Sequence, residues 1–324
     1  MIAVGIQLFD LAELGEATTS GDAGLLARFD EVCRDVGAFA MTGLTLPDGL
    51  IDRVHAATLE FFSLPYEAKV GLQSADGDQF VGWKGSNNVN EFGFQDHKEM
   101  FHIGPRVDGT LAGPDADGVV PAWSDDHGVE CPLWPDRLPA FRQTWHEYFR
   151  VMQENATTLG LAMAAALGVG QSAWMELIED NWADLAANYY PPATAGSGGV
   201  RNAIHSDLTM FTILYQDAGG GGGLRMQTRA GEWLDVPPRD DVFLVNVGEL
   251  LTYLTDGRWW AVPHEVSEAD LSAPGADTPR ISIPFFYRPN DAYTIAPLLG
   301  DAASEPLRVG EWVRNRKLLT RKAD

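Results

Sequence analysis

Two histidines and one aspartate in the second half of the chain form a possible metal-binding set. His205 and Asp207 flank Ser206, and His264 follows further along the chain. Side chains alternate between the two faces of a strand, so a strand through this triplet would point His205 and Asp207 the same way. Two imidazoles and one carboxylate can occupy one face of an octahedron and leave the other positions open, as mononuclear Fe(II) oxygenases require. The residues predict an iron site; the alternatives are a buried hydrogen-bonded pair at 205 and 207 and a core histidine at 264.

An arginine and a serine in a later apolar segment could bind a carboxylate. The segment Arg280–Arg288 reads RISIPFFYR and is typical of a strand, in which Arg280, Ser282, Phe286 and Arg288 would share one face. A guanidinium directed into an apolar barrel is unfavourable unless it meets an anion. Its planar fork suits a carboxylate bidentately. The pattern predicts a 2-oxoacid pocket beside the iron, with a structural salt bridge as the alternative.

The segments around these residues are predicted to be strands and turns. Apolar and β-branched residues from Ala203 to Tyr215 indicate a strand through His205 and Asp207. Val242–Val247 predicts a buried strand, and Gly248–Gly257 a short helix. The glycine run Ala218–Leu224 lacks the Gly-Lys-Ser/Thr of a phosphate loop, so a hairpin or a rim loop is expected. The strand spacing suits a double-stranded β-helix, a variant of the jelly roll.

The first half of the chain predicts an α/β segment that leads into a long helix. A strand is expected over residues 1–10, a helix with an aspartate N-cap over Asp22–Val36, and a short strand over Ala38–Gly43. A second helix is expected over Pro47–Phe62. Leu138–Leu167 is the longest helical pattern, and its aromatic stripe predicts a supporting helix along the outside of the sheet. The fold class is therefore mixed α and β.

Composition narrows the possible partners. The chain has 324 residues, 45% of them hydrophobic, and a formal net charge of −23, which argues against nucleic acid and anionic membrane surfaces. Cys33 and Cys131 imply neither a disulfide framework nor a thiolate metal cluster. The sequence contains no signal-peptide pattern and no apolar run of membrane-spanning length, so a cytoplasmic location is expected.

The order of these motifs resembles a known family. Asn188-x-Tyr190-Pro191, His205-x-Asp207, His264 and Arg280-x-Ser282 are similar in order and approximate spacing to the isopenicillin N synthase-like family of Fe(II)- and 2-oxoglutarate-dependent oxygenases and related oxidases. Most of the chain takes part in the resemblance. Its further segments are Val4–Asp10, Phe29–Phe39, Phe61–Lys69, His97–Phe101 and Phe285–Asn290. The last of them is close to the bacterial cephalosporin ring-expanding members. The chain departs from the family in a long loop, Ser267–Pro279, and in Val81-Gly82-Trp83 at the substrate mouth.

The resemblance implies a fold, a reaction and a set of ligands. It implies an N-terminal segment over residues 1–135 that works as one unit with a double-stranded β-helix core over residues 136–324. Fe(II) would be held by His205, Asp207 and His264, and 2-oxoglutarate by Arg280, Ser282, Tyr190 and Asn188. With O2, such an enzyme oxidises an unactivated C–H bond of a small metabolite by hydroxylation, desaturation or cyclisation. It releases succinate and CO2, here in bacterial secondary metabolism.

The resemblance also points to a substrate wall. The candidate positions are Phe286, Arg288, Phe211, Trp83 and Arg201. Of the cationic residues, Arg201, Arg288 or Lys84 could bind a carboxylate on the substrate. Core packing is an equal alternative for each aromatic residue. A monomer or a weak homodimer is expected.

Three alternatives remain open at the level of the sequence. The first is an Fe(II) oxidase of the isopenicillin N synthase type, which uses no 2-oxoglutarate and in which the Arg-x-Ser pair serves the substrate carboxylate. The second is a non-enzymatic binding protein on the same fold. The third is a Zn(II) hydrolase with the same ligands, for which no further general base is evident.

Overall fold

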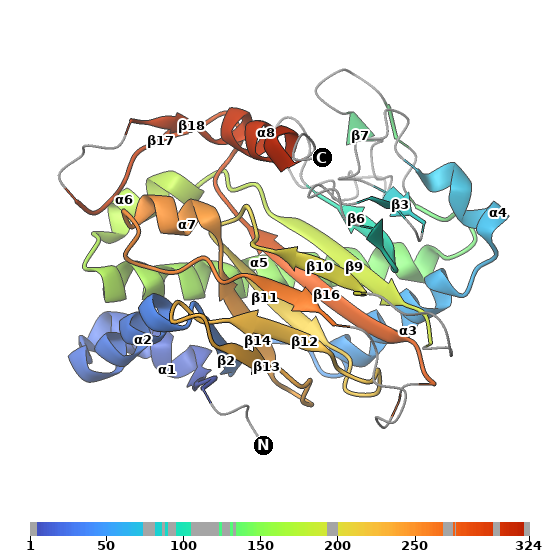
Figure 1. Ribbon diagram of the computed structural model, residues 1–324, viewed down its shortest axis with the longest axis horizontal. Coiled ribbons are helices and arrows are strands. Elements are labelled where there is room, and N and C mark those ends of the chain that lie inside the picture. Colours follow the sequence, from blue (N-terminus) through green and yellow to red (C-terminus); the bar gives the residue numbers. More distant parts are fainter. Residues whose placement is uncertain are drawn as a thin grey trace.

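Two β-sheets that face each other form the centre of the molecule (Figure 1). The computed structural model describes residues 5–73, 82–85, 88–89, 95–104, 123–124, 130–131, 134–192, 200–267, 275, 277–300 and 305–320. The major sheet has eight strands in the order β1-β2-β14-β11-β16-β9-β6-β3, and the minor sheet has the order β10-β15-β12-β13. The expected mixed α and β fold with a double-stranded β-helix core is confirmed.

The strands of the major sheet come from both halves of the chain. They are β1 (Leu8–Asp10), β2 (Ala38–Thr42), β3 (Gly82–Lys84), β6 (Glu99–Ile103), β9 (Asp184–Tyr190), β11 (Phe211–Gln216), β14 (Phe243–Val247) and β16 (Arg280–Tyr287). Because β1, β2, β3 and β6 precede residue 135, the N-terminal segment and the core share one hydrogen-bonded sheet.

The minor sheet and three strand pairs complete the β-structure. The minor sheet consists of β10 (Asn202–His205), β12 (Leu224–Gln227), β13 (Trp233–Asp235) and β15 (His264–Val266). The pairs are β4 (Asn88–Val89) with β5 (Gln95–Asp96), β7 (Trp123–Ser124) with β8 (Glu130–Cys131), and β17 (Thr294–Ile295) with β18 (Leu307–Arg308).

The described part of the chain also contains helices. They are α1 (Leu11–Ser20), α2 (Ala23–Asp35), α3 (Leu50–Phe62), α4 (Tyr66–Lys69), the 3-10 helix η1 (Val70–Leu72), α5 (Pro139–Leu167), α6 (Gln171–Ile178), α7 (Glu249–Leu254) and α8 (Val309–Thr320). The long helix α5 contacts α1, α2 and α3 and packs on β16, where the rings of Phe149 and Phe285 lie 5.3 Å apart. The prediction of a supporting helix outside the sheet is confirmed (Figure 1).

The two faces of the major sheet belong to two hydrophobic clusters. Odd-numbered residues such as Ile283 and Phe285 pack with the helices in the larger cluster. Tyr190 and Leu244 instead pack with Met226 of the minor sheet in the smaller cluster. We call the side toward the minor sheet the inner face. Strand register aligns the even-numbered residues of β6, β9, β11, β14 and β16 on it.

Several predicted elements are confirmed with small shifts of their ends. The predicted helix from Asp22 is α2, and the Asp22 carboxylate accepts hydrogen bonds from the backbone N–H groups of Gly24 and Leu25 at 3.0 Å. Gly168 ends α5 in the left-handed region, with φ of 70°. Helices α1 and α8 were not predicted. For α1 the signal was present, because Asp10 caps its first turn and Leu11 and Leu14 recur on its buried side.

One prediction about the central segment is wrong, and one of the two alternatives for the glycine run is excluded. No single strand runs through His205 and Asp207, because β10 ends at His205 and β11 begins at Phe211 in the other sheet. The glycine run is not a hairpin, because it connects β11 of the major sheet to β12 of the minor sheet. In both places the chain crosses between sheets, and local β-propensity carries no information on which sheet a strand joins.

Another prediction falls partly outside the described residues. Most of the expected loop Ser267–Pro279 belongs to that part. Among the described residues, no helix is both long and apolar enough to cross a membrane.

Candidate active site

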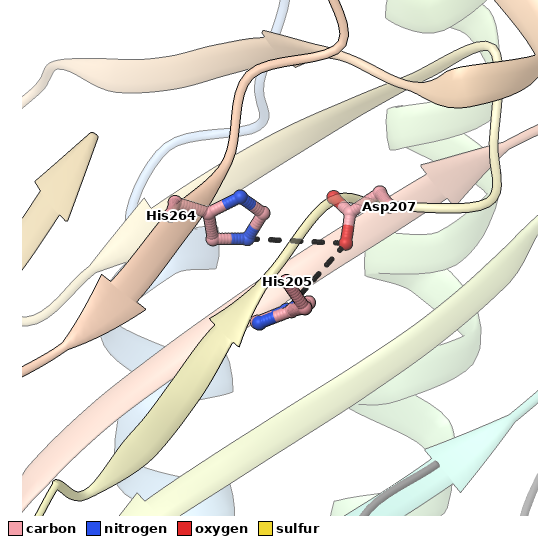
Figure 2. A group of neighbouring side chains, drawn as sticks. All are labelled: His205, Asp207 and His264. Carbon is pink, nitrogen blue, oxygen red and sulfur yellow. Dashed lines mark ion pairs between the residues drawn. The ribbon is translucent and has the colours of Figure 1, made fainter. Parts of the chain in front are cut away.

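His205, Asp207 and His264 meet between the two sheets (Figure 2). His205 and His264 are opposite each other on β10 and β15, and their ring centroids are 4.3 Å apart. Asp207 lies in the turn after β10, where its Oδ1 is 3.8 Å from Nε2 of His205 and 3.9 Å from Nε2 of His264. One potential ligand atom from each of the three residues lies within 4.8 Å of the others. The tertiary structure thus assembles the set that the sequence predicted.

Backbone carbonyls orient both imidazoles. Nδ1 of His205 lies 2.8 Å from the carbonyl oxygen of Ala203, and Nδ1 of His264 lies 3.1 Å from that of Val262. A carbonyl oxygen only accepts, so each Nδ1 carries the proton of the neutral ring. Nε2 of each ring is then left with its lone pair toward Asp207, which is the tautomer that a metal ligand needs.

Two inward-facing residues fix the Asp207 carboxylate. Oδ2 accepts a 2.5 Å hydrogen bond from the Thr212 hydroxyl and a 2.8 Å bond from the Asn246 amide. The other oxygen, Oδ1, therefore faces the two histidines. Burial alone would raise the pKa of Asp207, but the neighbouring His264 and His205 and the two hydrogen bonds bring it below its ordinary value.

The protonation states suit a metal. Burial lowers the pKa of His264 to about 4, with His205 adding to the shift and Asp207 opposing it. At neutral pH the set therefore consists of a neutral imidazole at 264 and an ionised carboxylate at 207. Two nitrogen donors and one carboxylate oxygen form the donor set of a mononuclear non-haem Fe(II) centre. The residues present fit that ion.

Arg280 is a buried cation with unused donors. It begins β16, faces inward and is only 1% exposed. Nη2 donates to Oε1 of Gln216 at 2.9 Å, whereas Nε and Nη1 have no hydrogen-bond partner within the described part of the chain. Burial lowers its pKa, while the adjacent Tyr190 opposes the shift. A desolvated guanidinium with two free donors fits a carboxylate ligand.

The other three residues predicted around the 2-oxoacid lie beside Arg280. Tyr190 is directly opposite Arg280 in the β9–β16 register, and Asn188 is directly opposite Ser282. The guanidinium carbon of Arg280 lies 4.8 Å from the Tyr190 ring centroid. The Asn188 side-chain oxygen is buried without a hydrogen-bond partner among the described residues. Strand pairing thus brings all four residues to one part of the inner face.

Phe286 lies at the other end of β16 and is the most accessible residue of that strand. It faces inward next to Thr212, and its ring lies 6.1 Å from the ring of His102 on β6. Lys84 on β3 is opposite Met100, on the same inner face. Phe286 and Lys84 are therefore positioned as the predicted substrate wall requires.

The other four candidates for the substrate wall do not fit that role. Phe211 and Trp83 lie on the helix side of the sheet, where Phe211 stacks on Tyr287 at 5.0 Å and Trp83 donates to Glu99 at 2.8 Å. They are packing residues.

The Arg288 guanidinium is held by Asp184 at 3.5 Å and by Asp291, which makes it the structural salt bridge that was considered for this strand. Arg201 bonds to backbone carbonyls rather than facing the metal set.

Sequence reasoning missed four residues of the site. Thr212 and Asn246 hold Asp207, Gln216 holds Arg280, and His102 faces Phe286. A usable signal was present, because each is a polar residue in a strand made mostly of apolar residues. A buried polar side chain needs a partner, so an isolated one inside a core strand points to a site on that face.

Two family models match the chain. The 2OG-Fe(II) oxygenase superfamily matches residues 181–289, and the model described as non-haem dioxygenase in morphine synthesis N-terminal matches residues 6–124. The matches cover the segment with the metal set and the N-terminal segment that completes the sheet. Both matches support the 2OG-Fe(II) oxygenase superfamily as the class of this chain. The protein is a 2-oxoglutarate-dependent non-haem iron dioxygenase, with Fe(II) and 2-oxoglutarate as its cofactors.

Named relatives agree with this assignment. The 2-oxoglutarate-Fe(II) type oxidoreductase ppzC of Metarhizium majus is 26% identical, over 87% of this chain and 77% of the relative. Validamycin A dioxygenase of Streptomyces hygroscopicus subsp. limoneus is 27% identical, over 97% of this chain and 87% of the relative. In fold the chain is similar to a Neurospora crassa protein solved in complex with alpha-KG and thymine, with a TM-score of 0.78 and 21% identity over 97% of each chain.

Proposed function

We propose that His205, Asp207 and His264 bind Fe(II), and that Arg280 and Ser282 bind the distal carboxylate of 2-oxoglutarate. The observation that carries this proposal is the pair of unpartnered donors on the fully buried Arg280, which share the inner face with the metal set. Bound iron and 2-oxoglutarate supply the oxidising power for the reaction with O2. Asn188 and Tyr190 contribute an amide and a phenol beside the same carboxylate.

The chain's own residues have three tasks in this proposal. The carbonyls of Ala203 and Val262 keep the histidines in the ligating tautomer. Thr212 and Asn246 keep the second oxygen of Asp207 occupied, so that only one oxygen is directed to the metal. The inner walls exclude water from the reacting carbon, which favours oxidation of the substrate over side reactions.

The substrate in this proposal is a small metabolite with an unactivated C–H bond, bound beside Phe286, His102 and Lys84. Hydroxylation, desaturation and cyclisation all fit this site, and Lys84 suits a substrate that bears a carboxylate. Secondary metabolism is supported by the relatives, one of which is named for validamycin A. A Phe286→Ala variant should retain 2-oxoglutarate binding but form succinate with less substrate oxidation. Unchanged coupling between the two products would contradict a substrate contact at Phe286.

Within the superfamily, we propose a bacterial member of the isopenicillin N synthase-like group. The segments Phe61–Lys69 and Phe285–Asn290 support this finer assignment. We further propose that residues 1–135 act with residues 136–324 as one unit, because they share one sheet in which N-terminal strands flank the core strands at both edges. A cytoplasmic monomer or weak homodimer stays a prediction, which sedimentation and fractionation would test.

An anaerobic titration tests the proposal directly. The Fe(II)-loaded protein is titrated with 2-oxoglutarate and followed by visible absorption. A weak charge-transfer band that saturates is expected for the wild type, and Arg280→Gln should need a much higher concentration to reach it. Absence of the band in protein with bound iron, together with product formation without succinate, would favour an oxidase that takes its electrons from the substrate.

A further inference from the structure

Two arginines share one aromatic ring at the end of the candidate 2-oxoacid pocket. The guanidinium carbons of Arg280 and Arg201 lie 4.8 Å and 5.7 Å from the ring centroid of Tyr190. Tyr190 and Arg280 are each 1% exposed, and Arg201 is partly buried. Among the ion pairs between described residues, none involves Arg201 or Arg280. The Asp217 carboxylate lies near enough to oppose the lowered pKa of Arg280, but its ion pair is with His55. The two adjacent cations repel each other, and an anion bound next to them would relieve that repulsion.

Arg201 also ties three backbone segments together. It precedes β10, its Nε donates to the carbonyl of Ser267 at 3.0 Å, and its Nη2 donates to the carbonyl of Gly222 at 2.6 Å. The backbone N–H of Ser267 donates to Gly223 at 2.9 Å. The end of β15 and the glycine run are thereby fixed to the start of β10.

The glycine run packs directly on both arginines. A Cβ atom on Gly220 would lie 2.5 Å from Cα of Arg280, and a Cβ atom on Gly223 would lie 2.3 Å from Nη2 of Arg201. Such distances are shorter than van der Waals contact, so side chains at these two positions would displace the arginines. The run is therefore a close-fitting support for the arginine pair.

We propose that Arg201 is a positioning residue for the dianionic 2-oxoacid: it holds Tyr190 and the loop Gly219–Gly223 against Arg280 and adds a second positive charge to the anion site. The proposal rests on the proposed role of Arg280. It assigns Arg201 to the co-substrate rather than to the substrate wall. In the same proposal, the glycine run packs closely against Arg280 and keeps it in place.

Binding measurements on the Fe(II) protein without O2 test the role of Arg201. In Arg201→Gln, the affinity for 2-oxoglutarate should fall about 10-fold, because one of two nearby charges is lost. Binding of 2-oxobutyrate, which has no distal carboxylate, should change less than two-fold. Arg201→Lys keeps the charge but cannot make both carbonyl bonds in the same geometry, so its loss should be smaller than that of Arg201→Gln.

Arg229 offers a matched control. It too donates to two backbone carbonyls, those of Arg258 and Gly257, and its guanidinium carbon lies 5.8 Å from the Trp260 ring centroid. Arg229→Gln removes the same charge and the same kind of bonds outside the arginine pair, and it should bind 2-oxoglutarate like the wild type. A loss equal to that of Arg201→Gln would overturn the proposal.

The glycine run provides an independent pair of variants. Gly220→Ala should weaken 2-oxoglutarate binding about 10-fold, because its methyl group forces Arg280 to shift. Gly219→Ala is the control in the same loop, because its Cβ would meet only the Asp217 carboxylate at 3.4 Å. Equal affinities in these two variants would contradict the supporting role of the loop.

Two further measurements distinguish a failure of the proposal for Arg201 from a failure of the proposed function. They are the iron content of Arg201→Gln and the 2-oxoglutarate affinity of Arg280→Gln. The proposal for Arg201 fails if Arg201→Gln binds 2-oxoglutarate within two-fold of the wild type while Arg280→Gln does not. It fails also if Arg201→Gln loses iron as strongly as 2-oxoglutarate, since that would reflect a disturbed β10 at His205. If Arg280→Gln itself binds 2-oxoglutarate normally, the proposed role of Arg280 in binding the distal carboxylate is wrong.

Discussion

His205 and His264 face each other across two neighbouring strands of the minor sheet, with their ring centroids 4.3 Å apart. Each ring is held through Nδ1 by the carbonyl of the residue two positions before it. The metal set is thus oriented by backbone atoms that no point mutation removes. Its sensitivity to substitution should therefore lie in the ligands and in the partners of Asp207.

Loss of a ligand should remove iron without unfolding the protein. We expect His205→Ala and Asp207→Ala to abolish turnover and to lower the affinity for Fe(II) by at least about 100-fold. This loss is larger than the one expected when only a hydrogen-bond partner of a ligand is removed. Metal analysis after anaerobic loading and circular dichroism would measure both properties. Ser206→Ala is the control, because Ser206 bonds to Glu249 at 3.1 Å instead of pointing at the set. Full activity in either ligand variant would exclude the residue as a ligand.

The partners of Asp207 should matter although they do not touch the metal. Thr212→Val and Asn246→Leu each remove one hydrogen bond to Oδ2 and leave Oδ2 free to rotate toward the metal. A decrease of about 10- to 100-fold in Fe(II) affinity is expected for such partners. Thr157→Val on α5 changes the same chemical group away from the site and should retain wild-type affinity. Equal iron titration curves for all three variants would show that the Asp207 carboxylate needs no support.

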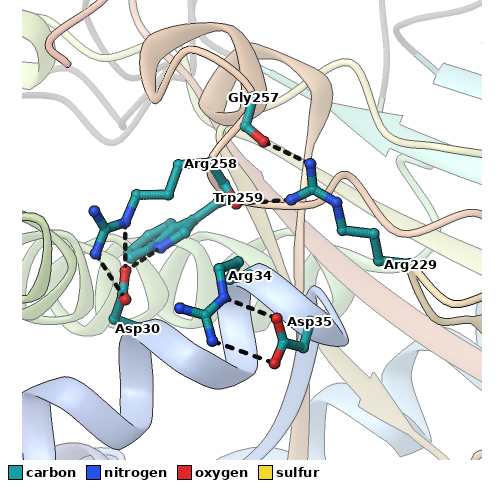
Figure 3. A network of polar contacts seen from close by, with 7 residues as sticks. All are labelled: Asp30, Arg34, Asp35, Arg229, Gly257, Arg258 and Trp259. Atoms are coloured by element: carbon teal, nitrogen blue, oxygen red, sulfur yellow. Dashed lines mark hydrogen bonds and ion pairs between the residues drawn. The ribbon is translucent and has the colours of Figure 1, made fainter. Parts of the chain in front are cut away.

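Asp30 connects α2 to the segment after α7 (Figure 3). It is 7% exposed and accepts hydrogen bonds from the Arg258 guanidinium at 2.9 and 2.8 Å and from the indole N–H of Trp259 at 2.8 Å. Asp30→Ala leaves the buried indole N–H without an acceptor, which should cost about 1–3 kcal/mol of unfolding free energy. Asp35→Ala removes an exposed partner of Arg34 and should leave the denaturant midpoint nearly unchanged.

The same carboxylate predicts an acid dependence of stability. Burial raises the pKa of Asp30, but its bonds to Arg258 and Trp259 outweigh that effect. The net pKa is lower than the ordinary value for an aspartate. The folded state therefore binds this proton less readily than the unfolded chain. The contribution of Asp30 should be complete above its ordinary pKa of about 4 and should be lost as pH falls through the lower folded value. Unfolding curves from pH 6 to pH 2 should show a smaller decline for Asp30→Asn than for the wild type.

Arg288 should matter for stability rather than for the co-substrate. Its buried guanidinium pairs with the buried Asp184 and the partly buried Asp291, so Arg288→Met removes the cation that these two carboxylates share. A loss of about 3–5 kcal/mol is expected for breaking such a pair. The affinity of the folded variant for 2-oxoglutarate should equal that of the wild type. A variant with normal stability and impaired substrate oxidation would return Arg288 to the substrate wall.

The helices and the polar residues of the site could be predicted to different extents. Amphipathic spacing and a capping aspartate identified α2, and the length of the apolar stripe identified α5. The polar residues Thr212, Gln216 and Asn246 were passed over, although each lies in a mostly apolar strand. Their partners lie in other strands, and a local pattern does not contain that information.

By itself the sequence determined the donor types and their order: two imidazoles, a carboxylate, and an arginine with a serine in a later strand. The alternation of side chains along β16 was enough to put Arg280, Ser282 and Phe286 on one face. Only the tertiary structure decided how these residues meet. His205 and Asp207 were expected to share a strand, yet a turn between two sheets brings them together. Arg288 follows the same alternation as Arg280 but is neutralised by Asp184 and Asp291, whereas Arg280 keeps two donors free. Which cation is paired and which is left for a ligand depends on contacts between distant segments, and these are fixed only when the sheets pack.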